Sequence, residues 1–182
     1  MPNGERWIDV SEFPDYEISD HGNVFSKRTN QQLVLSWNGR GTVKVNFSKE
    51  GRLHTRSVRV LVAEAFVAVE SADDSHREDL EVVNIDGDQT NNHYENLVWR
   101  PHWFAWKYTH QFREPPPEEY RVGLLNTQTG EVYSNVMDAG IADAVIWEYV
   151  YNSAITGRPV YPTGAVYEFI SPGTVSQLKH GL

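Results

Sequence analysis

The chain has 182 residues, of which 40% are hydrophobic, and a formal net charge of −9. It contains no cysteine, which excludes disulfides, thiolate metal sites and a cysteine nucleophile. We find no apolar run of about 18 residues and no secretory signal, so we expect neither a membrane span nor secretion.

The negative charge is distributed unevenly along the chain. Residues 1–60 carry 9 basic and 7 acidic side chains, residues 61–100 carry 2 and 10, and residues 101–182 carry 5 and 8. Because binding to DNA phosphates relies on excess positive charge, only the first segment has a balance typical of a DNA-binding surface.

Residues 1–57 are predicted to form an N-terminal antiparallel β meander. Turn dipeptides at 38–39 and 50–51 flank a segment in which Val43, Val45 and Phe47 alternate with polar residues. Residues 40–59 also hold a group of basic residues that either bind DNA phosphates or form a solvated strand face. These candidates are Arg40, Lys44, Lys49, Arg52, Arg56 and Arg59.

Residues 58–112 are predicted to form a central core. Helical spacing predicts a helix over 58–69, and the pattern then indicates a strand over 80–84 and a helix beginning near 91–92. The aromatic run 99–112 suggests a further helix after Pro101, and a helical aromatic stripe is more typical of a core than of a base-stacking surface.

An acidic stretch interrupts this central segment. It is either a solvated loop or a surface that attracts a basic host or viral protein. Its carboxylates are Glu70, Asp73, Asp74, Glu78, Asp79 and Glu81.

The proline-rich stretch 113–119 is predicted to be a linker, because consecutive prolines cannot continue a helix. Beyond it, residues 120–182 are predicted to form a small C-terminal α/β module. We expect a hairpin around 126–130, one or two helices within 136–155 and a strand within 163–169.

Several motifs of the chain resemble those of the phage-type HNH homing endonucleases. Residues 7–26 resemble a NUMOD4-like N-terminal element, and the IDGD, NN and ENLVW motifs within 85–99 resemble the HNH core. Residues 129–139 more loosely resemble a NUMOD1-like element. The resemblance implies an α+β fold with a central ββα-metal (HNH) core. It also implies a cytoplasmic protein, phage-encoded in a bacterial host, with DNA as a possible partner of its N-terminal basic strands.

The resemblance also implies roles for particular positions. In that family a histidine acts as the general base, an asparagine orients it, and two side chains bind one Mg²⁺ or Mn²⁺. The orienting asparagine corresponds to Asn96, and the base corresponds to Asn84, whose amide cannot accept a proton near neutral pH. The two metal-ligand positions correspond to Val83 and Ala105, which have no donor atom.

We therefore predict an HNH-like protein that has lost catalysis and acts by binding DNA or a protein, with Asn84 and Asn96 as vestigial site positions and no cofactor. One alternative is an active nicking enzyme with a rebuilt Mg²⁺ or Mn²⁺ centre at Asp86, His93 and His102. Another alternative is an acidic interaction or inhibitor protein without a nucleic-acid role.

Overall fold

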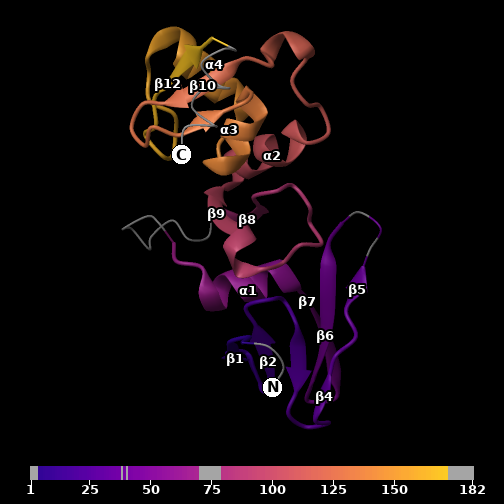
Figure 1. Ribbon diagram of the computed structural model, residues 1–182. Helices are drawn as coiled ribbons and strands as arrows, with labels where there is room; N and C mark the ends of the chain where they lie inside the picture. The colour runs from indigo at the N-terminus through magenta and orange to yellow at the C-terminus, as the bar shows by residue number, and fades with distance from the viewer. Residues whose placement is uncertain (1–3, 38, 40, 70–78, 172–182) are drawn as a thin grey trace. The chain divides into compact units, whose positions relative to one another are not determined.

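The protein has an α+β fold, as predicted, with antiparallel sheets and helices that form two compact units (Figure 1). The units are Met1–Ala105 and Trp106–Leu182. The computed structural model describes residues 4–37, 39, 41–69 and 79–171. Among these residues, no helix has both the length and the apolar character that crossing a membrane requires.

The N-terminal part of the first unit consists of two antiparallel sheets. The first sheet contains β1 (Trp7–Val10), β2 (Phe13–Ser19), β3 (Val24–Ser26) and β4 (Gln31–Gln32), in that order. The second sheet contains β5 (Ser36–Trp37), β6 (Val43–Lys49) and β7 (Arg52–Ser57), also in chain order. The predicted meander is therefore present, divided into two sheets.

A two-residue turn fixes how β6 pairs with β7. Glu50 and Gly51 both have positive φ, 53° and 74°, which is the conformation of a tight hairpin turn. The turn places Lys49 opposite Arg52 and continues the pairing to Lys44 opposite Ser57. Since residues directly opposite each other share a face of the sheet, this register decides which basic side chains point toward the core.

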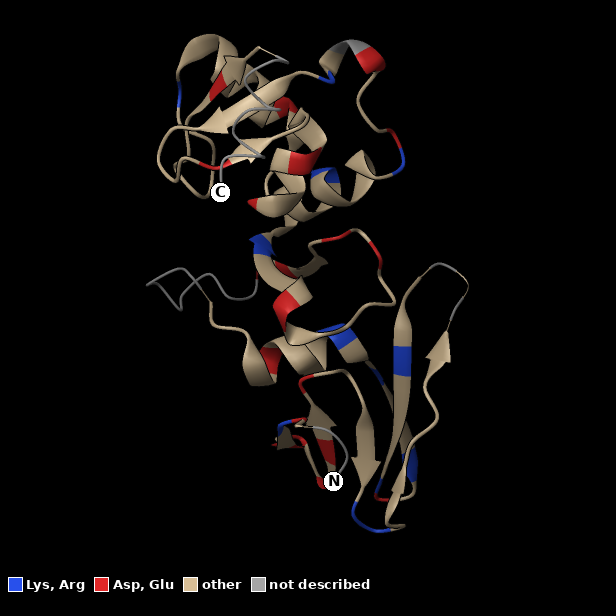
Figure 2. Cartoon of the chain, in the orientation of Figure 1, with Lys and Arg blue, Asp and Glu red and all other residues tan. Residues whose placement is uncertain are grey.

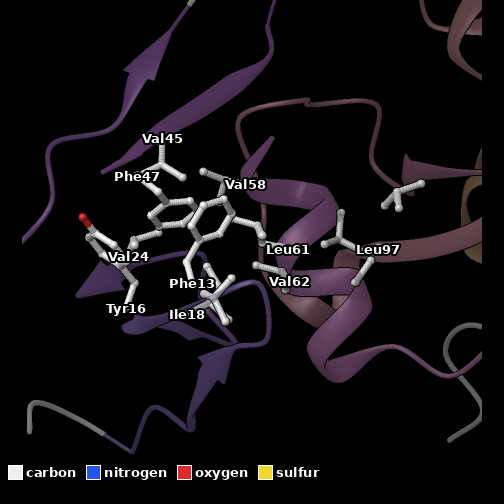
Figure 3. Packing of buried hydrophobic residues seen from close by; sticks show 13 residues of the cluster. Phe13, Tyr16, Ile18, Val24, Val45, Phe47, Val58, Leu61, Val62 and Leu97 are labelled. Atoms are coloured by element: carbon white, nitrogen blue, oxygen red, sulfur yellow. The ribbon is translucent and has the colours of Figure 1, made fainter. Parts of the chain in front are cut away.

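One hydrophobic core joins the N-terminal sheets to the segment that follows. Helix α1 (Val58–Phe66) buries Val58, Leu61, Val62 and Ala63, and Figure 3 shows its side chains against those of the sheets. Phe13 and Phe47 stack there with ring centroids 4.7 Å apart. The same cluster includes Val82 and Leu97, so residues on both sides of position 58 fold around a single core.

The central segment forms a hairpin followed directly by a helix. β8 (Leu80–Asn84) pairs antiparallel with β9 (Leu97–Pro101), and α2 (His102–Gln111) begins at the next residue. The expected helix near 91–92 was wrong. A short 3-10 turn, Tyr94–Asn96, occupies that region instead, because the chain must become extended again at Leu97 to pair with β8.

The second unit has a three-stranded sheet and two further helices. The sheet has the order β11 (Val132–Tyr133), β10 (Gly123–Asn126) and β12 (Tyr167–Ile170). The helices are α3 (Val136–Ala142) and α4 (Trp147–Thr156). A short 3-10 turn, Glu118–Tyr120, precedes the sheet. The expected hairpin, helices and final strand are all present, although the strand begins later than expected.

A partly buried carboxylate connects the parts of the second unit. Asp143 accepts hydrogen bonds from the hydroxyls of Tyr133 and Tyr167 and, at 3.1 Å, from Asn126 Nδ2. Burial and the neighbouring carboxylates raise the pKa of both tyrosines, so both phenols remain protonated donors at neutral pH. The interaction connects β10, β11 and β12 to the end of α3.

Candidate functional site

The β8–β9 hairpin and α2 form a ββα arrangement around the positions singled out by sequence. Asn84 is the last residue of β8 and pairs with Leu97, while Val83 pairs with Val98 one step earlier. Asn96 immediately precedes β9. The loop 85–96 connects the two strands, so the predicted base and orienting positions lie at the same end of the hairpin.

Asn96 holds this loop in place. Its Oδ1 accepts a hydrogen bond from the Asp86 backbone N–H at 3.0 Å, and its Nδ2 donates to Asp86 Oδ1 at 2.9 Å. Nδ2 also donates to the Asn91 carbonyl at 2.9 Å. One side chain therefore fixes both ends of the loop, which is a structural role independent of any reaction.

Asn84 and Asn96 meet at the same acceptor. The Asn84 Nδ2 donates to the Asn91 carbonyl at 2.8 Å, the oxygen that Asn96 also contacts. Asn84 is 3% exposed, and its Oδ1 has no hydrogen-bond partner among the described residues. The predicted base position is thus occupied by a buried amide, which stabilises the loop through a hydrogen bond.

The positions implied for metal binding do not fit a divalent cation. Val83 and Ala105 are 3% and 2% exposed and present only hydrocarbon, whereas Mg²⁺ and Mn²⁺ require oxygen or nitrogen ligands. Asn84 adds a single oxygen, Oδ1, because its Nδ2 donates to the Asn91 carbonyl. Within the described part of the chain, no three His, Asp or Glu side chains converge closely enough to hold a metal ion.

The turn that follows β8 is stabilised by its own acidic side chains. Asp86 Oδ1 accepts from the Asp88 N–H at 2.8 Å, and its Oδ2 accepts from Asn91 Nδ2 at 2.7 Å. Hydrogen bonds from the side chain and backbone of Thr90 lower the pKa of Asp88. Both carboxylates therefore accept hydrogen bonds from residues within the turn.

The three residues of the alternative rebuilt centre are not brought together. Asp86 lies in the turn after β8, whereas His102 lies beyond the other end of the hairpin, with its Nδ1 3.0 Å from Glu81 Oε2. His93 packs against His21 with ring centroids 4.5 Å apart. Five paired positions separate the two ends of the hairpin, which is more than any shared coordination sphere spans.

The loop is docked onto the N-terminal sheet through Asp20. The Asp20 carbonyl accepts from the Tyr94 N–H at 2.8 Å, and its carboxylate forms a 2.7 Å ion pair with Arg6. Burial opposes ionisation of Asp20, but the hydrogen bonds from Arg6 outweigh it and lower the pKa. Gly22 has a φ of 83°, and an added Cβ there would lie 3.1 Å from Asn92 Cβ, so the close approach favours glycine.

The predicted basic face is divided between two faces of the β5–β7 sheet. Lys44 shares the outward face with Asn46 and Ser48, opposite the buried Val45 and Phe47. Arg52 is exposed beside the hairpin turn. Figure 2 shows basic residues along the β6–β7 ribbon.

The remaining basic candidates make contacts within the protein. Arg56, opposite Val45, forms a 2.7 Å ion pair with Glu12 and lies over the Phe13 ring. Lys49 donates to the Glu12 carbonyl at 2.9 Å. Arg59 is 3.4 Å from Glu81 and has a pKa lowered by burial. Arg40 lies outside the described residues.

The acidic stretch lies largely outside the described residues, from Glu70 to Glu78. Asp79 is exposed, and Glu81 contacts both Arg59 and His102. The His102 side chain is 81% exposed.

The aromatic run divides between core and surface. Phe104 and Tyr108 are buried on α2, whereas Trp103 and Trp106 are 54% and 58% exposed. The expectation that the aromatic run belongs to a core therefore holds for Phe104 and Tyr108 and is wrong for the two tryptophans. Sequence reasoning missed the buried Gln111 at the end of α2. A single glutamine at a helix end belongs to no motif, so no sequence pattern could have identified it.

Two comparisons with known proteins agree with this geometry. Residues 5–58 match the family model of the NUMOD4 motif. The solved structure described as "DNA binding and cleavage by the HNH homing endonuclease I-HmuI" is similar with a TM-score of 0.51 and 19% sequence identity, covering 91% of this chain and 98% of that one. No curated protein matches.

The expected resemblance to phage-type HNH homing endonucleases is thus confirmed in the N-terminal motif and in the fold. The looser NUMOD1-like assignment of residues 129–139 stays a prediction.

Proposed function

From a NUMOD4 motif joined to the fold of an HNH homing endonuclease, we propose that this protein binds duplex DNA and no longer cleaves it. The observation that supports this proposal most strongly is that the positions to which the family resemblance assigns the base and the metal ligands hold Val83, Asn84 and Ala105, which are all buried.

The loss of cleavage follows from the chemistry of these side chains. Phosphodiester hydrolysis at such a centre needs a base that accepts a proton near neutral pH and ligands that hold a cation against the phosphate. An amide cannot act as that base, and valine and alanine cannot act as ligands. Asn96 has a role that does not depend on cleavage, because its side chain holds the loop through Asp86.

DNA binding is assigned to the outward face of β5–β7. A two-stranded ribbon is narrow enough to enter the major groove, where small polar side chains can reach base edges. Ser48, Thr55 and Asn46 supply hydroxyl and amide groups on that face, and Lys44 supplies a charge for phosphate. With one cation on this face and Arg52 beside it, the affinity is expected to be modest and sensitive to salt.

A salt titration tests the binding surface. Fluorescence anisotropy with a labelled duplex is expected to show binding that weakens as salt rises, and Lys44→Ala is expected to reduce the slope by about 0.9 for the one phosphate contact removed. The matched control is Lys27→Ala, which removes the same charge from a lysine paired with Asp9 at 2.9 Å. Equal effects of both variants would count against the assigned face.

A nicking assay tests the loss of cleavage. Supercoiled plasmid incubated with the protein and Mg²⁺ or Mn²⁺ is expected to remain supercoiled. Metal-dependent nicking that disappears in Asn96→Ala would refute the proposal and favour an active centre.

A further inference from the structure

The second unit contains a cavity that the proposed duplex-binding face does not explain. Its volume is about 640 Å³, within the range of small-molecule pockets. It is lined by α2 around Trp106, by the proline-rich stretch after α2, and by the start of α4 at Trp147. Every lining residue belongs to the second unit.

An aromatic stack forms one wall of this cavity. Trp106 and His110, one turn apart on α2, stack with centroids 3.9 Å apart and an interplanar angle of 29°. Trp106 is nevertheless 58% exposed. A large, oriented indole that remains open to solvent at a cavity provides a flat surface for another planar group.

A buried amide with an unused donor lines the same cavity. Gln111 is 5% exposed, and its Oε1 accepts from the Trp147 backbone N–H at 3.0 Å. This bond identifies the other amide atom as nitrogen. That Nε2 has no partner among the described residues, although an unsatisfied buried donor is costly. A ligand in this cavity is therefore expected to present an acceptor to Gln111.

The charges of the lining restrict the ligand further. Glu114 and Glu148 line the cavity, which disfavours a phosphate or a carboxylate and favours a group with hydrogen-bond donors. Lys107 also lines it, but its ammonium lies over the Tyr149 ring and 3.3 Å from the Tyr149 hydroxyl. An arginine side chain would suit the carboxylates but has no acceptor for Gln111.

We propose that this cavity binds a nucleobase carrying an exocyclic amino group, either as a nucleoside or as an unstacked base in a single strand. The base stacks on Trp106, its acceptor meets Gln111 Nε2, and its amino group faces the carboxylates. This site uses none of the residues of the β5–β7 face, so either proposal can fail while the other stands.

Side-chain NMR of the full chain tests the site directly. Titration with cytidine or adenosine is expected to shift the Gln111 side-chain amide and Trp106 indole signals, with weaker binding of thymidine, which lacks the amino group. Oligothymidylate containing one cytidine distinguishes a base within a strand from a free nucleoside. Saturable shifts with either form support the site.

Two variants separate stacking from hydrogen bonding. Trp106→Ala is expected to weaken binding about 5- to 150-fold, the effect of losing one base–aromatic stack. Gln111→Glu keeps an oxygen for the Trp147 N–H but replaces the free donor, so it is expected to abolish binding while the backbone spectrum remains folded. Trp103→Ala, on the same helix and outside the cavity, is the matched control and should bind normally.

Three results would overturn the assignment. The first is the absence of shifts at Gln111 and Trp106 with every nucleoside and oligonucleotide at millimolar concentration. The second is binding of thymidine as tight as that of cytidine. The third is tighter binding of arginine amide than of any nucleoside, which would make the cavity a site for a basic peptide.

Discussion

The β6–β7 and β8–β9 hairpins lie in one unit and share one core, but they use their polar side chains in opposite ways. At β8–β9, Asp86, Asn91 and Asn96 bond to one another and close the loop. At β6–β7, the polar side chains of one face point to solvent above a buried apolar face. A hairpin that resembles a catalytic frame is therefore held together by contacts within its own loop, whereas a binding face depends on which side chains remain exposed.

The largest expected effect concerns the two faces of β6–β7. Phe47→Ala removes a fully buried ring stacked on Phe13 and is expected to destabilise the protein by about 3–5 kcal/mol. Leu53→Ala, at a side chain 75% exposed on the outward face, should change stability by less than about 0.5 kcal/mol. Urea unfolding measures both, and similar losses would mean that the assignment of faces is wrong.

A smaller effect is expected in the β8–β9 loop. Asn96→Ala breaks three hydrogen bonds and should cost about 1–3 kcal/mol in unfolding free energy. Asp86→Ala should cost a similar amount, and the double variant should lose less than the sum because the two side chains bond to each other. Strict additivity in the double-mutant cycle would contradict a loop closed by this pair.

The smallest effect is a pH dependence at the contact that docks the loop. The pKa of Asp20 is lowered in the folded state, so its contribution to stability is present above the ordinary aspartate pKa and is lost as pH falls below about 4. Asp20→Asn should flatten this acid limb in urea midpoints measured between neutral pH and pH 3. An unchanged acid limb would show that other carboxylates control it.

Local patterns predicted most elements of this fold. Alternation in residues 43–47 and the turn at 50–51 predicted the β6–β7 hairpin, and helical spacing predicted α1. The helix expected near 91–92 was wrong because the chain pairs with β8 from Leu97 onward, which overrode the local sequence pattern. The sequence around a residue does not reveal which distant strand will pair with it.

For the candidate site, too, some properties could be predicted from the sequence and others required the structure. The sequence alone determined that positions 83, 84 and 105 lack a base and metal ligands, because that is a property of the side chains themselves. Only the tertiary structure decided that Arg56 pairs with Glu12, and that Gln111 meets Trp147 36 residues later in the chain. The physical reason is that chemical capacity belongs to each residue, whereas exposure and partnership depend on which distant segments pack against it.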